Sequence, residues 1–342
     1  MDLSKLGEFG LISRFQSRLK FHSPRVLHGI GDDCAVLLLD NGKFQVLTTD
    51  ALVESVHFNL KYQQPEKLGW KTLAVSISDV AAMGARPQFA VLSLGIPQTL
   101  PMEFLDRFYK GLNQASSQYQ VAVVGGDTVA SPKHLFINLA LLGETFEKKV
   151  FTRAGARPGD ALLVTGTLGD SAAGLELLKT KRKQIDIPQG LQRKLIQKHL
   201  KPEPRMETAR WLAQSRLNIT SMIDISDGLA QDLGHILKAS GVGAELWKAH
   251  IPLSKSIIKA EKTMGFSALE LALGGGEDYE LLFTLSPEDV NNLNIESITQ
   301  AGPPVTQIGV ITATKGIRLV EVNGHKRLLQ RPEGFNHFRD KA

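Results

Sequence analysis

The chain has 342 residues, of which 42% are hydrophobic and 22% charged, a balance typical of a soluble globular protein. No apolar run approaches the roughly 18 residues that a membrane span needs, and the N-terminus lacks the apolar core and cleavage site of a signal peptide. The single cysteine, Cys34, excludes an internal disulfide and favours a reducing compartment. These features predict a cytoplasmic protein of about two domains with no membrane association.

The net charge of +5 and the isoelectric point near 9.1 raise the question of nucleic-acid binding. Much of the excess lies in KTKRK (179–183) and RKLIQKHLKPEPR (193–205). The second segment interleaves basic residues with Leu195, Ile196 and Leu200 at helical spacing, which is typical of a surface helix with a solvated face. Because no nucleic-acid motif accompanies the charge, we expect no nucleic acid among the partners. A basic, non-catalytic nucleic-acid-binding protein remains the alternative from a different class.

The first part of the chain alternates strand-like apolar runs with helical patterns. Residues 34–50 flank the turn NGK with two such runs and predict a hairpin. The segment 69–87 predicts a helix with apolar residues on one face, stopped by Gly84 and Pro87. A strand, a helix and two strands are then expected at 88–97, 102–119, 121–127 and 134–144.

The second part begins with a basic connecting segment, 148–160, that contains an RPGD turn. A strand is expected at 161–166, followed by a glycine-containing loop and a helix at 167–178. Residues 221–237 repeat that order of strand, acidic turn and helix, and 272–285 predict a glycine-rich turn entering a strand. Because strands and helices mix without strict βαβ alternation, the predicted fold class is α+β. The domains are expected at 1–148 and 149–342.

Aspartates recur beside small residues where apolar runs stop. In GIGDDCAVLLLD (29–40), Asp32 and Asp33 stand at the entry of a strand, although carboxylates about 4 Å apart repel by roughly 4 kcal/mol at an effective dielectric near 20. If the runs meet, the carboxylates remain ionised only when divalent cations neutralise them. Oxygen ligands without a Cys or His cluster favour Mg²⁺. The further aspartates of this pattern are Asp50, Asp79, Asp127, Asp224 and Asp227.

Taken one at a time, these aspartates have a simpler explanation. Asp170 and Asp227 precede helical patterns and are therefore candidate N-caps. Aspartate is also common in turns. Only the recurrence in both halves favours a metal site. The loop 166–174 can present N–H groups of a helix start to an anion. However, the P-loop motif and the kinase glycine loop with its HRD and DFG elements are missing, so any ATP would be bound on neither common scaffold.

Eight segments, taken in order, resemble the thiamine-monophosphate kinase family of the aminoimidazole ribonucleotide synthetase-like superfamily. They are GIGDDCA, TTDALVESVHF, AVSISDVAAMGARP, GGDT, TRAGARPGD, VTGTLGDSAAG, DISDGLAQDLGH and GGGEDYELLFT. The resemblance runs from about residue 7 to GFNHF at 334–338, which is essentially the whole chain. The combination of DISDG, GGGEDYEL and GDSAAG is specific.

The resemblance implies two α+β domains with an active-site cleft between them. The N-terminal domain would bind metal and ATP and would pair its sheet with that of a second copy, closing a barrel in a homodimer. The C-terminal domain would complete the ATP and substrate cleft. The implied reaction, in thiamine diphosphate biosynthesis, is direct in-line phosphoryl transfer from ATP to thiamine phosphate on several Mg²⁺ ions. The rival on this scaffold is another ATP-using enzyme of the superfamily. Two enzymes of this superfamily use a reactive cysteine near one end of the chain, and Cys34, the single cysteine here, does not match either position.

The resemblance also implies roles for individual residues. The implied metal ligands are Asp33, Thr48, Thr49, Asp50, Asp79, Asp127, Asp224 and Asp227. The implied ATP contacts are Gly126, Asp127, Arg153 and Ser226, and the implied thiamine phosphate contacts are His57, Glu277 and Phe335. The family commonly has Trp or Tyr at Phe335, so the aromatic face is kept while a polar hydrogen bond is lost. No general base is expected, since a phosphate monoester with a second pKa near 6 is already anionic at pH 7. Asp32 is expected to support Asp33 through turn hydrogen bonds.

Overall fold

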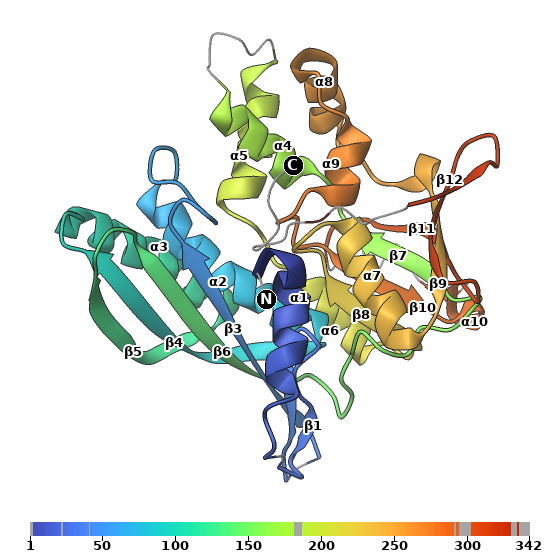
Figure 1. Cartoon of the computed structure of the whole chain (residues 1–342), viewed down its shortest axis with the longest axis horizontal. Coiled ribbons are helices and arrows are strands. Elements are labelled where there is room, and N and C mark those ends of the chain that lie inside the picture. The colour runs from blue at the N-terminus through green and yellow to red at the C-terminus, as the bar shows by residue number, and fades with distance from the viewer. Residues whose placement is uncertain are drawn as a thin grey trace.

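The computed structural model describes residues 3–21, 23–40, 42–180, 187–290, 292–293, 302–329 and 334. Two β-sheets with their covering helices lie side by side, and helix α1 (Leu3–Gln16) lies in front of their junction (Figure 1). This arrangement confirms the predicted α+β class. No helix within these ranges is long and apolar enough to cross a membrane.

The first sheet has six strands in the order β1-β2-β3-β6-β4-β5. Neighbours are antiparallel except β4 and β5, which are parallel and are connected through α3 (Met102–Tyr119). Strands β2 and β3 form the predicted hairpin. The strands are β1 (Val26–His28), β2 (Ala35–Leu38), β3 (Phe44–Val53), β4 (Ala85–Pro97), β5 (Ala122–Ser131) and β6 (Phe136–Thr145).

Three details of this part differ from the sequence predictions. Asp50 and Asp127 lie inside β3 and β5, not at the ends of these strands. A strand need not end at an aspartate, because the carboxylate can point out from one face of the sheet. Pro87 lies inside β4 and does not stop the preceding helix. A register shift between Pro87 and Phe89 accommodates the residue that has no N–H. The helix ends at Ala82, and Gly84 turns the chain with φ +65°.

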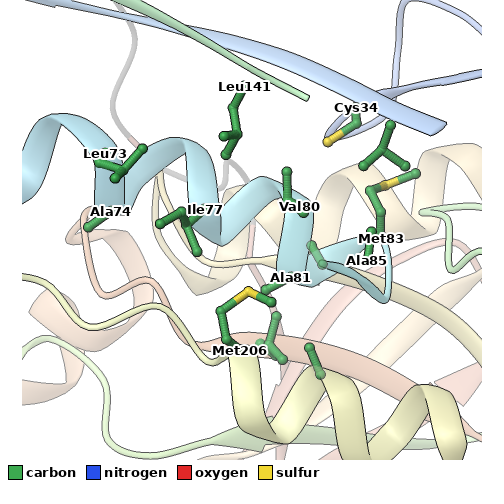
Figure 2. Close-up of a cluster of buried hydrophobic side chains, with 14 of the residues drawn as sticks. Cys34, Leu73, Ala74, Ile77, Val80, Ala81, Met83, Ala85, Leu141 and Met206 are labelled. Carbon is green, nitrogen blue, oxygen red and sulfur yellow. The ribbon is translucent and has the colours of Figure 1, made fainter. Parts of the chain in front are cut away.

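Helix α2 (Pro65–Ala82) lies between the two sheets. It packs against β3, β4 and β6 on one side, and against β8 (Ile219–Asp224) and α6 (Met206–Gln214) on the other. Figure 2 shows Val80 beneath Leu141 and Cys34, with Met206 on the opposite side of the helix. Cys34 is therefore a buried core thiol. Because α2 is enclosed, its polar side chains need partners inside the protein. Those that concern the site are Lys71, Ser76, Ser78 and Asp79.

The second sheet has seven strands in the order β13-β12-β9-β11-β7-β10-β8, and its central strands β7 and β10 are wholly buried. The predicted strand, turn and helix at 221–237 are present as β8 and α7 (Leu229–Ser240). The remaining strands are β7 (Ala161–Thr165), β9 (Gly243–Trp247), β10 (Leu281–Leu285), β11 (Val305–Thr312), β12 (Gly316–Val320) and β13 (Lys326–Leu328). The helices are α4 (Asp170–Lys179), α5 (Gln189–Leu200), α8 (Lys255–Met264), α9 (Ala268–Gly274) and α10 (Pro287–Val290), with a 3₁₀ turn at Lys248–His250.

The basic segment that raised the question of nucleic-acid binding lies largely in α5. Leu195 and Leu200 are buried while Arg193 and Lys194 are exposed, so the predicted surface helix is confirmed.

The face of the first sheet that points away from α2 carries exposed apolar side chains. Five large ones on β3, β4, β5 and β6 are between 39% and 55% exposed: Leu47, Phe89, Val91, Val129 and Phe136. An apolar face of this kind is typical of an interaction surface.

Candidate active site

Elements from both sheets bring carboxylates together at the junction beside α2. Asp33 precedes β2, Asp79 lies in the last turn of α2, and Asp224 ends β8. One carboxylate oxygen from each of these residues lies within 4.8 Å of the other two. Aspartates from both halves of the chain therefore meet, as the recurrence in the sequence predicted.

Burial and mutual repulsion raise the pKa values of the carboxylates in this acid cluster. Burial raises the pKa of Asp33 to about 6, and burial together with the charge of Asp33 raises the pKa of Asp224 to about 8. Burial, followed by the charges of Asp50, Asp224 and Asp33, raises the pKa of Asp79 well above its ordinary value. Burial also raises the pKa of Asp50. Arg153 opposes the shifts at Asp33 and Asp224, but burial and the neighbouring carboxylates outweigh its charge.

Hydroxyl groups on neighbouring elements orient the acids. The donor–acceptor pairs are Thr48 Oγ1 to Asp79 at 2.5 Å, Ser76 Oγ to Asp50 at 2.6 Å and Ser78 Oγ to Asp224 at 2.6 Å. The two serines belong to α2 and were not predicted from the sequence. Their signal was the stretch VSISD, which places hydroxyls in an otherwise apolar helix next to Asp79.

Arg153 forms hydrogen bonds with the adjacent residues Asp32 and Asp33. Its Nη2 and Nε donate to Asp33 Oδ1 at 2.6 and 3.1 Å, and its backbone N–H donates to Asp32 Oδ2 at 3.1 Å. Asp32 also accepts the N–H of Asp33 at 3.0 Å. Asp32 thus makes the turn hydrogen bonds expected of it. Arg153 connects the acid cluster to the segment that joins the two sheets.

The donor set of the cluster fits a hard divalent cation. It consists of oxygen atoms, and Oδ2 of Asp33 is buried without a hydrogen-bond partner. A buried carboxylate oxygen without a partner is costly unless something else binds it. Carboxylate oxygens of this kind suit Mg²⁺, which is held by a few carboxylates together with waters and substrate phosphates.

A cleft of about 1710 Å³ opens beside the cluster. Helices α1 and α7 both line it, and the two helices touch where the ring of Phe9 contacts that of His235, with 4.7 Å between centroids. The cleft exceeds the roughly 300–1,000 Å³ of an ordinary small-molecule pocket, so it has room for a nucleotide. Among the residues expected to bind metal or ATP, it is lined by Thr48, Thr49, Arg153, Ser226 and Asp227.

Asp127 and Thr49 point away from the acid cluster within one chain. Along β3, Thr48 and Asp50 face α2, and Thr49 between them faces the open side of the sheet. Asp127 pairs with Ser93, which pairs with Asn138, and the amide of Asn138 donates to Thr49 at 3.0 Å. Strands are about 4.8 Å apart, so the three steps from β3 to β5 separate Asp127 from Thr49 by about 14 Å.

Gly126, another expected ATP contact, has a structural reason to be glycine. Its φ is +156°, and a Cβ there would overlap the carbonyl oxygen of Leu92 on β4. A larger residue would therefore displace β5 together with the neighbouring Asp127.

The expected thiamine phosphate contacts lie in three different situations. His57 Nδ1 accepts the N–H of Val53 at 2.9 Å in the turn after β3. Glu277 lies between Lys71 of α2 and His199 of α5. Phe335 lies outside the described residues. Lys71 and His199 were missed from the sequence, although a lysine in the apolar run of α2 was a signal for a buried charge pair.

The sequence predicted N-caps at Asp170 and Asp227 and an anion site in the loop 166–174. In the structure, the N–H groups at these places bind the carboxylates of other residues. Asp278 accepts the N–H groups of Gly169 at 2.7 Å and Ser171 at 3.4 Å, so these groups in the loop 166–174 bind an anion of the protein itself. The N-cap positions of α4 and α7 are Gly169 and Gly228, not Asp170 and Asp227. Just before α7, the carboxylate of Asp232 accepts the N–H groups of Asp227 and Gly228.

The metal-free protein is expected to lose stability as the pH rises. Folded Asp33 and Asp224 hold protons up to about pH 6 and 8, whereas unfolded aspartate releases its proton near pH 4. Between these values the folded state binds more protons, so the free energy of unfolding falls with increasing pH. We expect the melting temperature to drop by roughly 5 °C or more from pH 5 to pH 8, and Mg²⁺ to reverse the drop. Calorimetry with EDTA or MgCl₂ measures this; a flat metal-free profile would contradict it.

Comparison with known proteins agrees with this fold and site. A model of the N-terminal domain of AIR synthase related proteins matches residues 31–145, and one of their C-terminal domain matches residues 157–321. The two sheets with an acid cluster at their junction are therefore those of an AIR synthase related protein. The chain is 40% identical to the thiamine-monophosphate kinase of Escherichia coli (strain K12) over 97% of this chain and 98% of that protein. The chain belongs to the thiamine-monophosphate kinase family.

Two further relatives match over nearly their full lengths. The thiamine-monophosphate kinase of Aquifex aeolicus (strain VF5) is 39% identical, over 99% of this chain and 100% of that protein. The structure of AaThiL complexed with AMPPCP and TMP has a TM-score of 0.84 and 37% identity, and the match covers 98% of this chain and 99% of that chain.

Proposed function

We propose that this protein transfers the γ-phosphate of ATP to thiamine phosphate, forming ADP and thiamine diphosphate. The observation that carries the proposal is the acid cluster beside a nucleotide-sized cleft in a chain of this family. AMPPCP is an analogue of ATP, and its presence with TMP in the related AaThiL structure supports the same pair of substrates here. The absence of the P-loop and protein-kinase motifs agrees with phosphoryl transfer on a different scaffold.

Asp33, Asp79 and Asp224 would hold Mg²⁺, with Asp50, Asp227 and Thr48 beside them. Bound Mg²⁺ supplies positive charge that neutralises the phosphates of both substrates and the charge that develops between them. The acceptor phosphate is already anionic at neutral pH. The side chains therefore act by positioning and by electrostatics, and we assign no general base.

Arg153 is placed to change partners when metal binds. Its guanidinium now donates to Asp33 and lines the cleft together with Ser226. A cation on Asp33 would weaken this ion pair, since both compete for the same carboxylate. Arg153 would then donate to ATP phosphates, for which a planar guanidinium is well suited. His57, Glu277 and Phe335 are assigned to thiamine phosphate.

A homodimer would complete the site. Asp127 and Thr49 lie on the open face of the first sheet but about 14 Å apart in one chain. The same face is apolar and exposed. A second copy packed on this face would cover it and would bring its own Gly126 and Asp127 toward the cleft of the first. In this arrangement residues 1–148 bind metal and ATP and form the dimer, residues 149–342 complete the cleft, and the protein works in the cytoplasm.

The direct test is to incubate the purified protein with ATP, MgCl₂ and thiamine phosphate and to measure thiamine diphosphate and ADP. We expect equimolar formation of both products, complete dependence on Mg²⁺ and no phosphoenzyme. Thiamine without phosphate serves as the control acceptor. ATP hydrolysis without thiamine diphosphate would reject the proposal in favour of another ATP user of the same superfamily.

A further inference from the structure

Glu277 is fixed on both carboxylate oxygens by residues from the two parts of the molecule. Lys71 Nζ of α2 lies 2.6 Å from Oε1, and His199 Nδ1 of α5 lies 2.9 Å from Oε2. Ser171 Oγ at the start of α4 lies 3.2 Å from the same histidine nitrogen. The side chain of Lys71 is 0% exposed and that of His199 is 5% exposed, whereas Glu277 keeps 23%. Helices α2 and α5 thus meet at one carboxylate that still reaches the surface, and α4 contacts the histidine of this group.

The backbone at Glu277 is held in an unusual conformation. Its φ is +67°, a strained conformation that is uncommon for a residue other than glycine. Its N–H donates to the carbonyl oxygen of Ser226 at 2.7 Å. A Cβ on Gly276 would lie 2.6 Å from that same oxygen, so the preceding residue must be glycine. The loop is therefore fixed against the turn that carries Ser226, which lines the cleft.

The surrounding charges set the protonation state of this group. Burial by itself raises the pKa of Glu277, but the charge of Lys71 and the charge and hydrogen bond of His199 lower it to about 2. Burial and the charge of Lys71 lower the pKa of His199, whose Nδ1 lies 2.9 Å from Oε2 of Glu277. The other titratable groups that interact with these residues are Tyr62, Tyr279 and Lys179.

We propose that Lys71 and His199 are positioning residues that hold Glu277 ionised and oriented to accept a hydrogen bond from the amino group of thiamine phosphate. This inference rests on the proposed function. A carboxylate has about four lone-pair sites, and the two contacts leave sites on its exposed side for a substrate donor. Thiamine carries an exocyclic amino group and a positively charged thiazolium ring, and both favour an anionic acceptor.

Lys71 has no other evident purpose. Its Nζ makes an ion pair with Glu277 but no well-directed hydrogen bond to any described residue. A fully buried ammonium is costly, and replacing a buried ion pair by apolar residues is often neutral or stabilising. A need to keep Glu277 ionised would explain why a charged lysine occupies position 71. A purely structural contact between the two parts of the molecule would not need that charge.

The test compares Lys71→Met, Glu277→Gln and the double variant in steady-state kinetics. We expect each single variant to raise KM for thiamine phosphate by about 10- to 100-fold, with KM for ATP within about twofold. The double variant should be no worse than Glu277→Gln, because Lys71 acts only through Glu277. Lys67→Met, four residues earlier on α2, is the matched control and should behave as wild type, because among the described residues Lys67 forms no ion pair with Glu277. Losses that add in the double variant would overturn the inference.

Two readouts separate positioning from a structural role. In Lys71→Met the desolvated Glu277 loses its counter-charge and gains a proton more readily. The ratio of the variant's KM for thiamine phosphate to that of wild type should therefore rise as the pH falls from 8 to 6. In Lys71→Arg, which keeps the charge, this ratio should stay constant with pH. Oxythiamine phosphate, which has a carbonyl in place of the amino group, should be discriminated against by wild type and much less by Glu277→Gln. If Lys71→Met does not fold, His199→Leu and its donor-retaining control His199→Asn replace it. Wild-type protein without turnover of thiamine phosphate would refute the proposed function instead.

Discussion

Asp79→Asn is expected to lower turnover of thiamine phosphate by about 10³-fold or more while the chain stays folded. Asp79 belongs to the cluster, since one of its oxygens lies within 4.8 Å of ligand atoms from both Asp33 and Asp224. Asparagine has nearly the same shape, and its oxygen still accepts the hydrogen bond from Thr48. The substitution therefore removes a charged metal ligand with little change in packing.

The same substitution should stabilise the protein when metal is absent. Burial and the neighbouring carboxylates raise the pKa of Asp79, so an uncharged amide relieves repulsion in the folded state. We expect a higher melting temperature in EDTA for the variant and a smaller rise on adding Mg²⁺ than for wild type. Asp106→Asn, on the exposed side of α3, is the control and should change neither quantity. Asp79→Asn protein with turnover within a few-fold of wild type would contradict the metal assignment.

The acid cluster was predictable because its signal is local and repeated. Asp33, Asp79 and Asp224 each stand at an apolar element, and a carboxylate next to a buried element lies near the core whichever way the elements pack. The α+β class followed from the mixture of strand and helix patterns. The supporting hydroxyls of Ser76 and Ser78 were weaker signals, because serine in a helix most often faces solvent or its own backbone.

The parts that could not be predicted depend on long-range pairing. The sequence groups Asp127 with Asp50, but β6 and β4 lie between their strands. Nothing local to either strand encodes that order. His199 looked like one more polar residue of a basic surface helix, and only the approach of α2 and the Glu277 loop gives it a partner. Similarly, the loop before α4 offers N–H groups to an anion, but its occupant, Asp278, lies far along the chain.

Mixing two inactive variants, Asp79→Asn and Asp127→Asn, is expected to restore about a quarter of wild-type turnover. In the proposed dimer each site takes its acid cluster from one chain and Asp127 from the other. After subunits exchange, about half of the dimers are mixed, and each mixed dimer has one site with both aspartates intact. The measurement is turnover after the variants are co-expressed or refolded together, with dimer formation checked by sedimentation.

The control mixture is Asp33→Asn with Asp79→Asn. These residues belong to the same cluster within one chain, so every site in a mixed dimer lacks one of them and no activity should return. Recovery in this control would mean that the cluster itself is shared between chains. No recovery with the Asp127 variant, in a protein that does dimerise, would place Asp127 outside the site. The open apolar face would then serve assembly alone, because the strand order keeps Asp127 about 14 Å from Thr49 in a single chain.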